Sequence, residues 1–254
     1  MIYNNYGDIC NGGVVMKFVQ AQFSLKYEPQ LKIRRSANQI EDLLQEYYGA
    51  PQVIPIPDDI AAEAPRIVLN SHNGHSQINF SQIAVDFTAR FDGGFSQDYE
   101  QTKEYIKKRV QLLKQALRDI GINEYYFFGL TYNIHLDIGA STPLDYIKDL
   151  LGGNLTSKEN LYEVMQRVAS LEEDKFFINQ QISTFKEYQS NGMNIPNLID
   201  FTNSKLVAEG VSVSLDINNR YAFLSKGANT QMQDFDADFI KIFDLIEQNM
   251  KKFE

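Results

Sequence analysis

The sequence has almost no cysteine and no long hydrophobic run. Cys10 is the only cysteine among 254 residues, which excludes an intramolecular disulfide and a cluster of thiolate metal ligands. No apolar stretch approaches the roughly 20 residues that a transmembrane helix requires. The first ten residues, MIYNNYGDIC, have neither the basic nor the apolar segment of a signal peptide. We therefore expect a soluble, cytoplasmic protein without a membrane partner.

The sequence also lacks the short motifs that accompany common catalytic and cofactor sites. It contains no G-x-S-x-G nucleophile motif, no phosphate-binding Walker loop and no G-x-G-x-x-G dinucleotide motif. The glycine pair at residues 152–153 is not followed by the lysine of a phosphate-binding loop, and it is interpreted as a break between helices. No cofactor and no catalytic residue is predicted from motifs.

A surplus of basic residues is absent as well. Lys and Arg total 24 against 33 Asp and Glu, which gives a net charge of −9. Nucleic-acid binding draws most of its affinity from the neutralisation of phosphates, so this charge argues against a nucleic-acid partner. Five basic residues on one predicted helix are interpreted as its solvent-facing side: Lys103, Lys107, Lys108, Lys114 and Arg118.

Three segments are expected along the chain. Residues 1–15 are predicted to be a disordered leader. Gly12 and Gly13 can be encoded by codons that resemble a bacterial ribosome-binding sequence just before Met16, so Met16 is expected to be the natural start. Residues 16–123 and 124–254 are predicted to form two α+β halves.

A hairpin is the strongest structural prediction for the first half, where residues 66–91 are expected to turn at Asn73-Gly74 in a type I′ turn. In that register Leu69 faces Ile78 and Ile67 faces Phe80, so apolar residues pair. After the turn the apolar positions are even-numbered up to Phe80 and odd-numbered from Ile83, and this shift by one residue predicts a bulge near residues 81–82.

The remaining elements follow from the period of the apolar positions. Helices are predicted from residue 96 or 98 to 121 and from 234 to 253, each with an apolar stripe at helical spacing. Residues 143–171 are predicted to be helical with a break, and residues 189–205 to be a loop. The other expected elements are strands at 19–27, 126–138 and 176–188, a short helix at 36–48, and a second hairpin that pairs 211–217 with 221–223.

These elements predict an α+β fold of mainly antiparallel sheets with helices packed on one face. Each half reads as strand, helix, hairpin and helix, so we expect an internal duplication. This expectation rests on element order, because the two halves share negligible side-chain identity.

Histidines and carboxylates are the candidate metal ligands. In the predicted hairpin His72 and His75 are neighbours on the wet face, and His135 and Asp137 lie on the polar face of a later strand. Two imidazoles are too few for zinc, which normally takes three or four protein ligands, and the spacing matches no zinc motif. The histidines are therefore interpreted as residues that flank a turn, with a metal site as the alternative.

Two aspartates and two aromatic residues are the other candidates. Asp86 and Asp216 lie between apolar neighbours, in VDF and LDI, and paired acids can perform acid–base or metal-dependent chemistry. Alternation places both on the polar face, where they are interpreted as solvent-facing. Tyr125 and Phe127 fall on the nominally polar face of their strand, which predicts an interface with a partner or between the two halves.

Three segments resemble a sporadically distributed, functionally uncharacterised bacterial protein family: FFGLTYNIHLDI, VSVSLDIN and FIKIFDLIEQNMKKFE. The resemblance covers about the last half of the chain. Where that family usually has an Arg-Tyr-Ile-Asn run, this chain has Thr131-Tyr132-Asn133, without the arginine. The resemblance implies no established catalytic residues, and it implies an association with mobile or defence genes.

Three functions remain open from the sequence. The first is a non-enzymatic interaction or assembly protein of a bacterial complex, acting with a protein partner or as a homodimer. The second is a metal-dependent hydrolase or nuclease that uses His72, His75 and His135 with Asp86 and Asp137. The third is a protein that binds a small ligand between its two halves.

Overall fold

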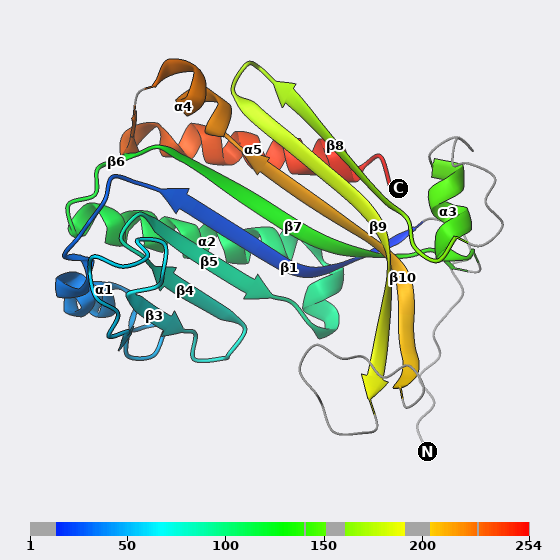
Figure 1. The fold of residues 1–254 in the computed structure, drawn as a ribbon, viewed down its shortest axis with the longest axis horizontal. Coiled ribbons are helices and arrows are strands. Elements are labelled where there is room, and N and C mark those ends of the chain that lie inside the picture. The colour runs from blue at the N-terminus through cyan, green and yellow to red at the C-terminus, as the bar shows by residue number, and fades with distance from the viewer. Residues whose placement is uncertain (1–13, 140, 151–160, 191–203, 228, 254) are drawn as a thin grey trace.

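The computed structural model describes residues 14–139, 141–150, 161–190, 204–227 and 229–253. Most strands join in one antiparallel sheet with the order β2-β3-β4-β5-β1-β7-β10-β9-β8 (Figure 1). Their bounds are β1 Val15–Lys26, β2 Gln52–Val53, β3 Ile67–Asn70, β4 Ser76–Phe80, β5 Ala84–Arg90, β7 Phe127–Asp137, β8 Met165–Glu172, β9 Phe176–Ser190 and β10 Ser204–Asn218. A second, small sheet pairs β6 Glu124–Tyr125 with β11 Thr230–Gln231.

The two long helices pack on the same face of the large sheet, as predicted, whereas the short helix Arg220–Lys226 contacts Phe127 on the other face. The two long ones are α2 Tyr99–Asp119 and α5 Phe235–Met250, and both lie behind the sheet in Figure 1. The shorter helices are α1 Ala37–Leu44, α3 Pro143–Leu150 and α4 Arg220–Lys226, and 3₁₀ turns span Ile33–Ser36, Gly93–Gln97 and Met232–Asp234. The α+β class is therefore confirmed. No helix of the described residues is long and apolar enough to cross a membrane.

The central strands β1 and β7 show why the sheet has two different faces. Successive side chains of a strand point to opposite faces, and every second residue is apolar and buried along β7 and along β1 from Ala21 onward. Before Ala21 the register of β1 shifts at Val19, so the buried residue there is Phe18. Phe23 of β1 and Phe128 of β7 meet Phe235 of α5, at ring-centroid distances of 6.0 and 4.4 Å. Burying one such side chain contributes roughly 1.5–3 kcal/mol. The intervening polar residues are left on the uncovered face.

The two halves share this sheet, because β1 pairs with β7 along its whole length. From β1 the chain runs through α1, the strands β2, β3, β4 and β5, and then α2. From β7 it runs through α3, the strands β8, β9 and β10, and then α5, with the short α4 inserted before α5. The first half therefore adds four strands to the sheet beside β1, and the second half adds three beside β7. Residues 66–91, which the sequence predicted as one hairpin, form the three strands β3, β4 and β5.

The first hairpin has the predicted register but a different turn. Leu69 is opposite Ile78 and Ile67 is opposite Phe80, as predicted. The turn bond, however, runs from the Gly74 N–H to the Ser71 carbonyl, and only Gly74 has a positive φ, of 74°. The type I′ turn on Asn73-Gly74 was therefore wrong. The change of parity after Phe80 reflects a tight turn into β5, closed by a bond from the Ser81 N–H to the Ala84 carbonyl, and not a bulge.

The second half departs further from the predicted elements. Residues 143–171 are helical only as far as Leu150, and 165–171 belong to β8; the proposed break at 152–153 lies outside the described residues. The strand at 176–188 and the last helix are confirmed. The second hairpin was wrong, because residues 221–223 belong to α4, where Phe223 packs on Tyr126 at 4.8 Å between ring centroids. Most of the predicted leader, residues 1–13, also lies outside the described residues, and β1 begins at Val15.

Candidate functional site: the uncovered face of the sheet

The face of the sheet opposite α2 and α5 is lined by polar side chains. One row crosses six neighbouring strands, and each member is directly opposite the next: Gln77, Thr88, Gln22, Thr131, Asp216 and Asn179. Cross-strand partners lie on the same face, so these six side chains form one continuous band. No described helix crosses the middle of this face in Figure 1.

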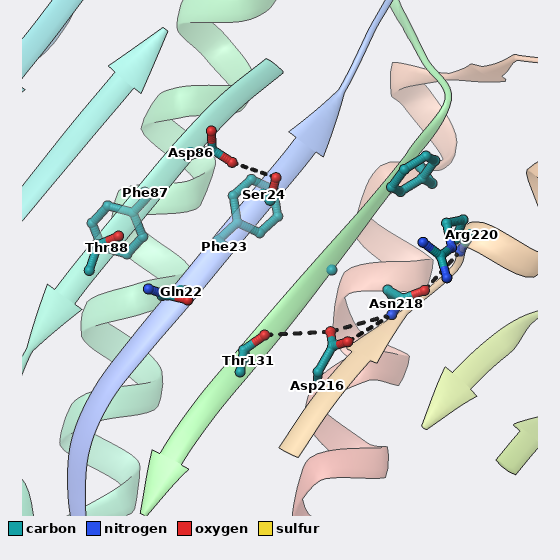
Figure 2. Close-up of a pocket in the computed structure, with 12 residues that line it drawn as sticks. Gln22, Phe23, Ser24, Asp86, Phe87, Thr88, Thr131, Asp216, Asn218 and Arg220 are labelled. Atoms are coloured by element: carbon teal, nitrogen blue, oxygen red, sulfur yellow. Dashed lines mark hydrogen bonds between the residues drawn. The ribbon is translucent and has the colours of Figure 1, made fainter. Parts of the chain in front are cut away.

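A groove of about 340 Å³ opens on this face above Gly129 of β7. Gly129 lies between Ser24 of β1 and Asn218 of β10 in the sheet register. A Cβ atom at residue 129 would lie 2.6 Å from the Asn218 Cβ, so only glycine fits here. Figure 2 shows polar side chains from both halves around the resulting gap.

Two aspartates lie at opposite sides of the groove. Ser24 Oγ donates a hydrogen bond to Asp86 at 2.5 Å, and Lys26 Nζ lies 3.9 Å from the same carboxylate. Asp216 accepts hydrogen bonds from neutral groups: Thr131 Oγ1 at 3.4 Å, Asn179 Nδ2 at 3.0 Å, and Asn218 Nδ2 at 3.2 and 3.3 Å. Among the described residues no cationic side chain forms an ion pair with Asp216.

The separation of these aspartates argues against acid–base chemistry by the pair. Asp86 and Asp216 are three strands apart, and neighbouring strands are about 4.8 Å apart, which places them roughly 14 Å or more from each other. Carboxylates that cooperate in glycoside hydrolysis are about 5–9.5 Å apart. The polar-face placement predicted for both aspartates is confirmed, and the structure adds that they line the same groove.

The two aspartates have the same kinds of cross-strand neighbours. Asp86 is opposite Ser24 on the central strand of its half and opposite Asn79 on the outer side. Asp216 is likewise opposite Thr131 and Asn179. Each half therefore places an asparagine, an aspartate and a hydroxyl side chain in a row on the uncovered face.

The structure keeps the predicted metal-ligand candidates apart. His72 lies at the tip of the β3–β4 hairpin, where its Nε2 is 2.9 Å from the Gln45 carbonyl oxygen. His75, in the same turn, faces Asp92 at 3.9 Å. His135 and Asp137 lie on β7, three strands away from β4. Within the described ranges no three His, Cys, Asp or Glu side chains are grouped so that they could hold a metal ion.

His135 is instead part of an aromatic contact. Its ring stacks on Phe185 of β9 with 4.1 Å between ring centroids. The phenyl ring has room because Gly210 of β10 lies between them, and a Cβ atom there would be 2.8 Å from Phe185. Burial lowers the pKa of His135, and Lys17 lowers it further against the opposing effect of Glu187. Asp137 is exposed and accepts a hydrogen bond from the Gly139 N–H at 3.1 Å.

Tyr125 offers no exposed surface to a partner. Tyr125 is fully buried in its own chain, where its ring contacts Phe128 and Phe235. The regular strand begins again at Phe127, after an interruption at residue 126, so Tyr125 and Phe127 do not share a face. Phe127 is half-buried on the uncovered face, lines the groove and lies 6.1 Å from Phe223 of α4.

Several groove residues were not singled out from the sequence: Gln22, Ser24, Thr88, Asn218 and Arg220. Each strand shows the alternation that predicts its polar face, but the strand order decides which polar residues become neighbours. No family model matches the sequence, and no curated protein shows significant similarity to it.

Proposed function

We propose that this chain is a non-enzymatic binding protein of a bacterial cytoplasmic complex, and that it holds a protein partner on the uncovered face of its sheet. The observation that carries the proposal is the polar band with a groove at its centre. Side chains there are partly buried yet keep hydrogen-bonding groups directed outward, which suits the recognition of polar groups on a partner. The resemblance to a family associated with mobile or defence genes suggests where such a complex acts.

The chemistry of the groove favours a basic side chain of the partner. Asp216 is held by neutral donors, so its negative charge remains available to a lysine or arginine of the partner. The net charge of −9 adds a long-range attraction for a basic partner, and salt weakens it.

Replacing one carboxylate tests this proposal. Asp216→Asn keeps the shape of the side chain and removes its charge, and Asp137→Asn makes the same change at an exposed end of β7. We expect the wild-type chain and Asp137→Asn to retain the same host protein at low salt. We expect Asp216→Asn to bind it about tenfold or more weakly, the usual effect of losing a charge-assisted contact. Quantitative affinity purification followed by titration with the purified partner measures the difference.

Two results would contradict the proposal. One is equal partner binding by the wild-type chain and Asp216→Asn. The other is hydrolysis of a nucleic acid or ester by the purified chain with added Mg²⁺ or Mn²⁺, which would support the metal-dependent enzyme.

A small ligand is the second candidate, because the groove spans the junction of the two halves and its volume falls in the usual range of ligand sites. A thermal-shift screen with small cationic amines distinguishes this candidate from a protein partner. Stabilisation of the wild-type chain that is lost in Asp216→Asn would favour the small ligand.

We also propose that the two halves arose by duplication. The support is that a strand, a helix, a run of sheet strands and a long helix follow one another from β1 and from β7, with one Asn-Asp-hydroxyl row in each half. The halves differ in the short strand β2 of the first and the short helix α4 of the second. On this proposal the groove lies at a junction of two related units.

A further inference from the structure

The two edges of the large sheet differ in how they are protected. One edge is β2, which has only two residues and is flanked by Pro51 and Pro55. A short strand beside prolines is a common protection against unwanted strand pairing. The opposite edge is β8, which is eight residues long and contains no proline or glycine. Its described partner is β9 alone, so one side of its backbone is free of strand pairing among the described residues.

The edge strand β8 also exposes apolar side chains. Seven of its eight residues are exposed, and Met165, Val168 and Leu171 expose 60, 51 and 38% of their surface. A long, exposed, partly apolar edge strand is a template for another strand. We infer that β8 pairs antiparallel with β8 of a second copy of this chain, so that the two large sheets become continuous.

The sequence of β8 selects one register for this pairing. A two-fold axis perpendicular to the sheet keeps each residue opposite one of the same face. With the axis at Val168, Val168 faces its own copy and Met165 faces Leu171 of the second copy. All three exposed apolar residues then contact apolar residues across the interface.

Pairings with the axis one residue to either side of Val168 are less favourable. An axis at Arg167 places two guanidinium groups opposite each other, and like charges directly opposite are destabilising. An axis at Ala169 pairs Val168 with Ser170 and Leu171 with Arg167, so the apolar contacts are lost. The self-complementary register at Val168 is the reason to assign the edge to a second copy rather than to a different protein.

This inference goes beyond the proposed groove function and does not rest on it, because β8 contributes no residue to the groove. A chain that binds a partner at the groove but stays monomeric would contradict only the dimer. A dimeric chain that binds no partner at the groove would contradict only the groove function.

The oligomeric state of the full chain tests the inference. Light scattering and sedimentation are expected to show a dimer at micromolar concentration. Val168→Lys places two ammonium groups opposite each other, and it is expected to raise the dimer dissociation constant by at least about tenfold. Val53→Lys is the matched control, because Val53 lies on the other edge strand with a similar exposure of 48%. It is expected to leave the dimer intact.

A cysteine pair tests the register independently of folding defects. With Cys10 replaced by serine, Val168→Cys is expected to form a disulfide between two copies when oxidised glutathione accepts the electrons, because Cα atoms of opposed strand residues lie within disulfide range, at about 4.5–5.5 Å. Arg167→Cys is expected to react far less, because it faces Ala169. A strictly monomeric wild-type chain, a dimer unaffected by Val168→Lys, or equal cross-linking by both cysteine variants would overturn the inference.

Discussion

At the scale of single residues, the groove exists because one position has no side chain. Gly129 leaves room beside Asn218 that a methyl group would close, and Gly210 makes room in the same way for Phe185. Both glycines lie inside strands, where glycine is otherwise unfavourable for lack of side-chain packing. Their presence is explained by close approach within the sheet and not by turn formation.

Gly129→Ala is expected to lower the free energy of unfolding by about 1–3 kcal/mol, the usual cost of forcing extra volume into a packed site. The physical reason is the 2.6 Å approach of the new Cβ atom to the Asn218 Cβ. Gly94→Ala is the matched control, because nothing lies within 4 Å of a Cβ atom there, and it should change stability little. Chemical denaturation of both variants measures the difference, and equal stabilities would contradict the steric account of the groove.

Buried Arg66 shows another residue whose role comes from its surroundings. Its guanidinium donates hydrogen bonds to the carbonyl oxygens of Ala64, Pro57 and Ile60, at 2.9, 3.2 and 2.6 Å. These bonds hold the proline-rich connector between β2 and β3 against the sheet. These backbone acceptors and the Asp58 carboxylate, which lies 3.9 Å from the Arg66 Nε, stabilise the buried charge.

At the scale of elements, ion pairs connect the two long helices. Lys103 and Lys114 of α2 reach Glu247 and Asp236 of α5, at 2.5 and 2.7 Å. These two lysines belong to the basic set that the sequence assigned to solvent. Their charges are used within the chain, which further weakens the case for a nucleic-acid surface on α2.

Asp236 is expected to contribute to stability in a pH-dependent way. Partial burial raises the pKa of Asp236, but hydrogen bonds from Gln111 and Lys114 outweigh it, so the pKa is lowered. A carboxyl with a lowered pKa in the folded state stabilises fully above its unfolded pKa of about 4, and that contribution is lost as the pH falls through the folded pKa.

Asp236→Asn is therefore expected to be less stable than the wild-type chain at pH 7, by up to about 1 kcal/mol for a partly exposed pair. The difference should shrink as the pH is lowered from 5 to 2. Urea unfolding across this range measures it, with Asp59→Asn as the control, because Asp59 is exposed and has no ion pair among the described residues. A difference that stays constant with pH would contradict the role of the carboxylate.

At the scale of the whole molecule, the two halves share one hydrophobic core. Buried residues of both halves belong to a single cluster, and β1 and β7 lie side by side at the centre of the sheet. Separation of the halves would expose the β1 and β7 edges and the apolar residues beneath them. The halves therefore depend on each other for stability.

We expect the chain to unfold in one cooperative transition. Ile78→Ala and Ile217→Ala remove fully buried side chains from the first and the second half, each at a cost of about 2–5 kcal/mol. Both variants should shift the same single transition in calorimetry and in circular dichroism. Two separate transitions, each moved by only one of the variants, would show that the halves unfold independently.

The sequence alone determined the class of fold and the local elements with strong periodicity. Alternation predicted the two faces of β7, of β10 and of β1 from Ala21 onward, and helical spacing predicted α2 and α5, because burial of one face requires these periods. The register shift at Val19 of β1 was not predicted. Prediction from the sequence failed where a short alternating pattern fits both a strand and a helix. Residues 221–223 alternate like a strand, yet contacts with Tyr126 and Phe127 place Phe223 on a helix.

Only the tertiary structure decided the candidate site and the free edge. Asp86 and Asp216 were visible as polar-face residues, but the order β5-β1-β7-β10 brings them to one groove. The same order leaves β8 at one edge and β2 at the other. Strand order depends on pairing between segments far apart in the sequence, and local periodicity contains no information about which strands become neighbours.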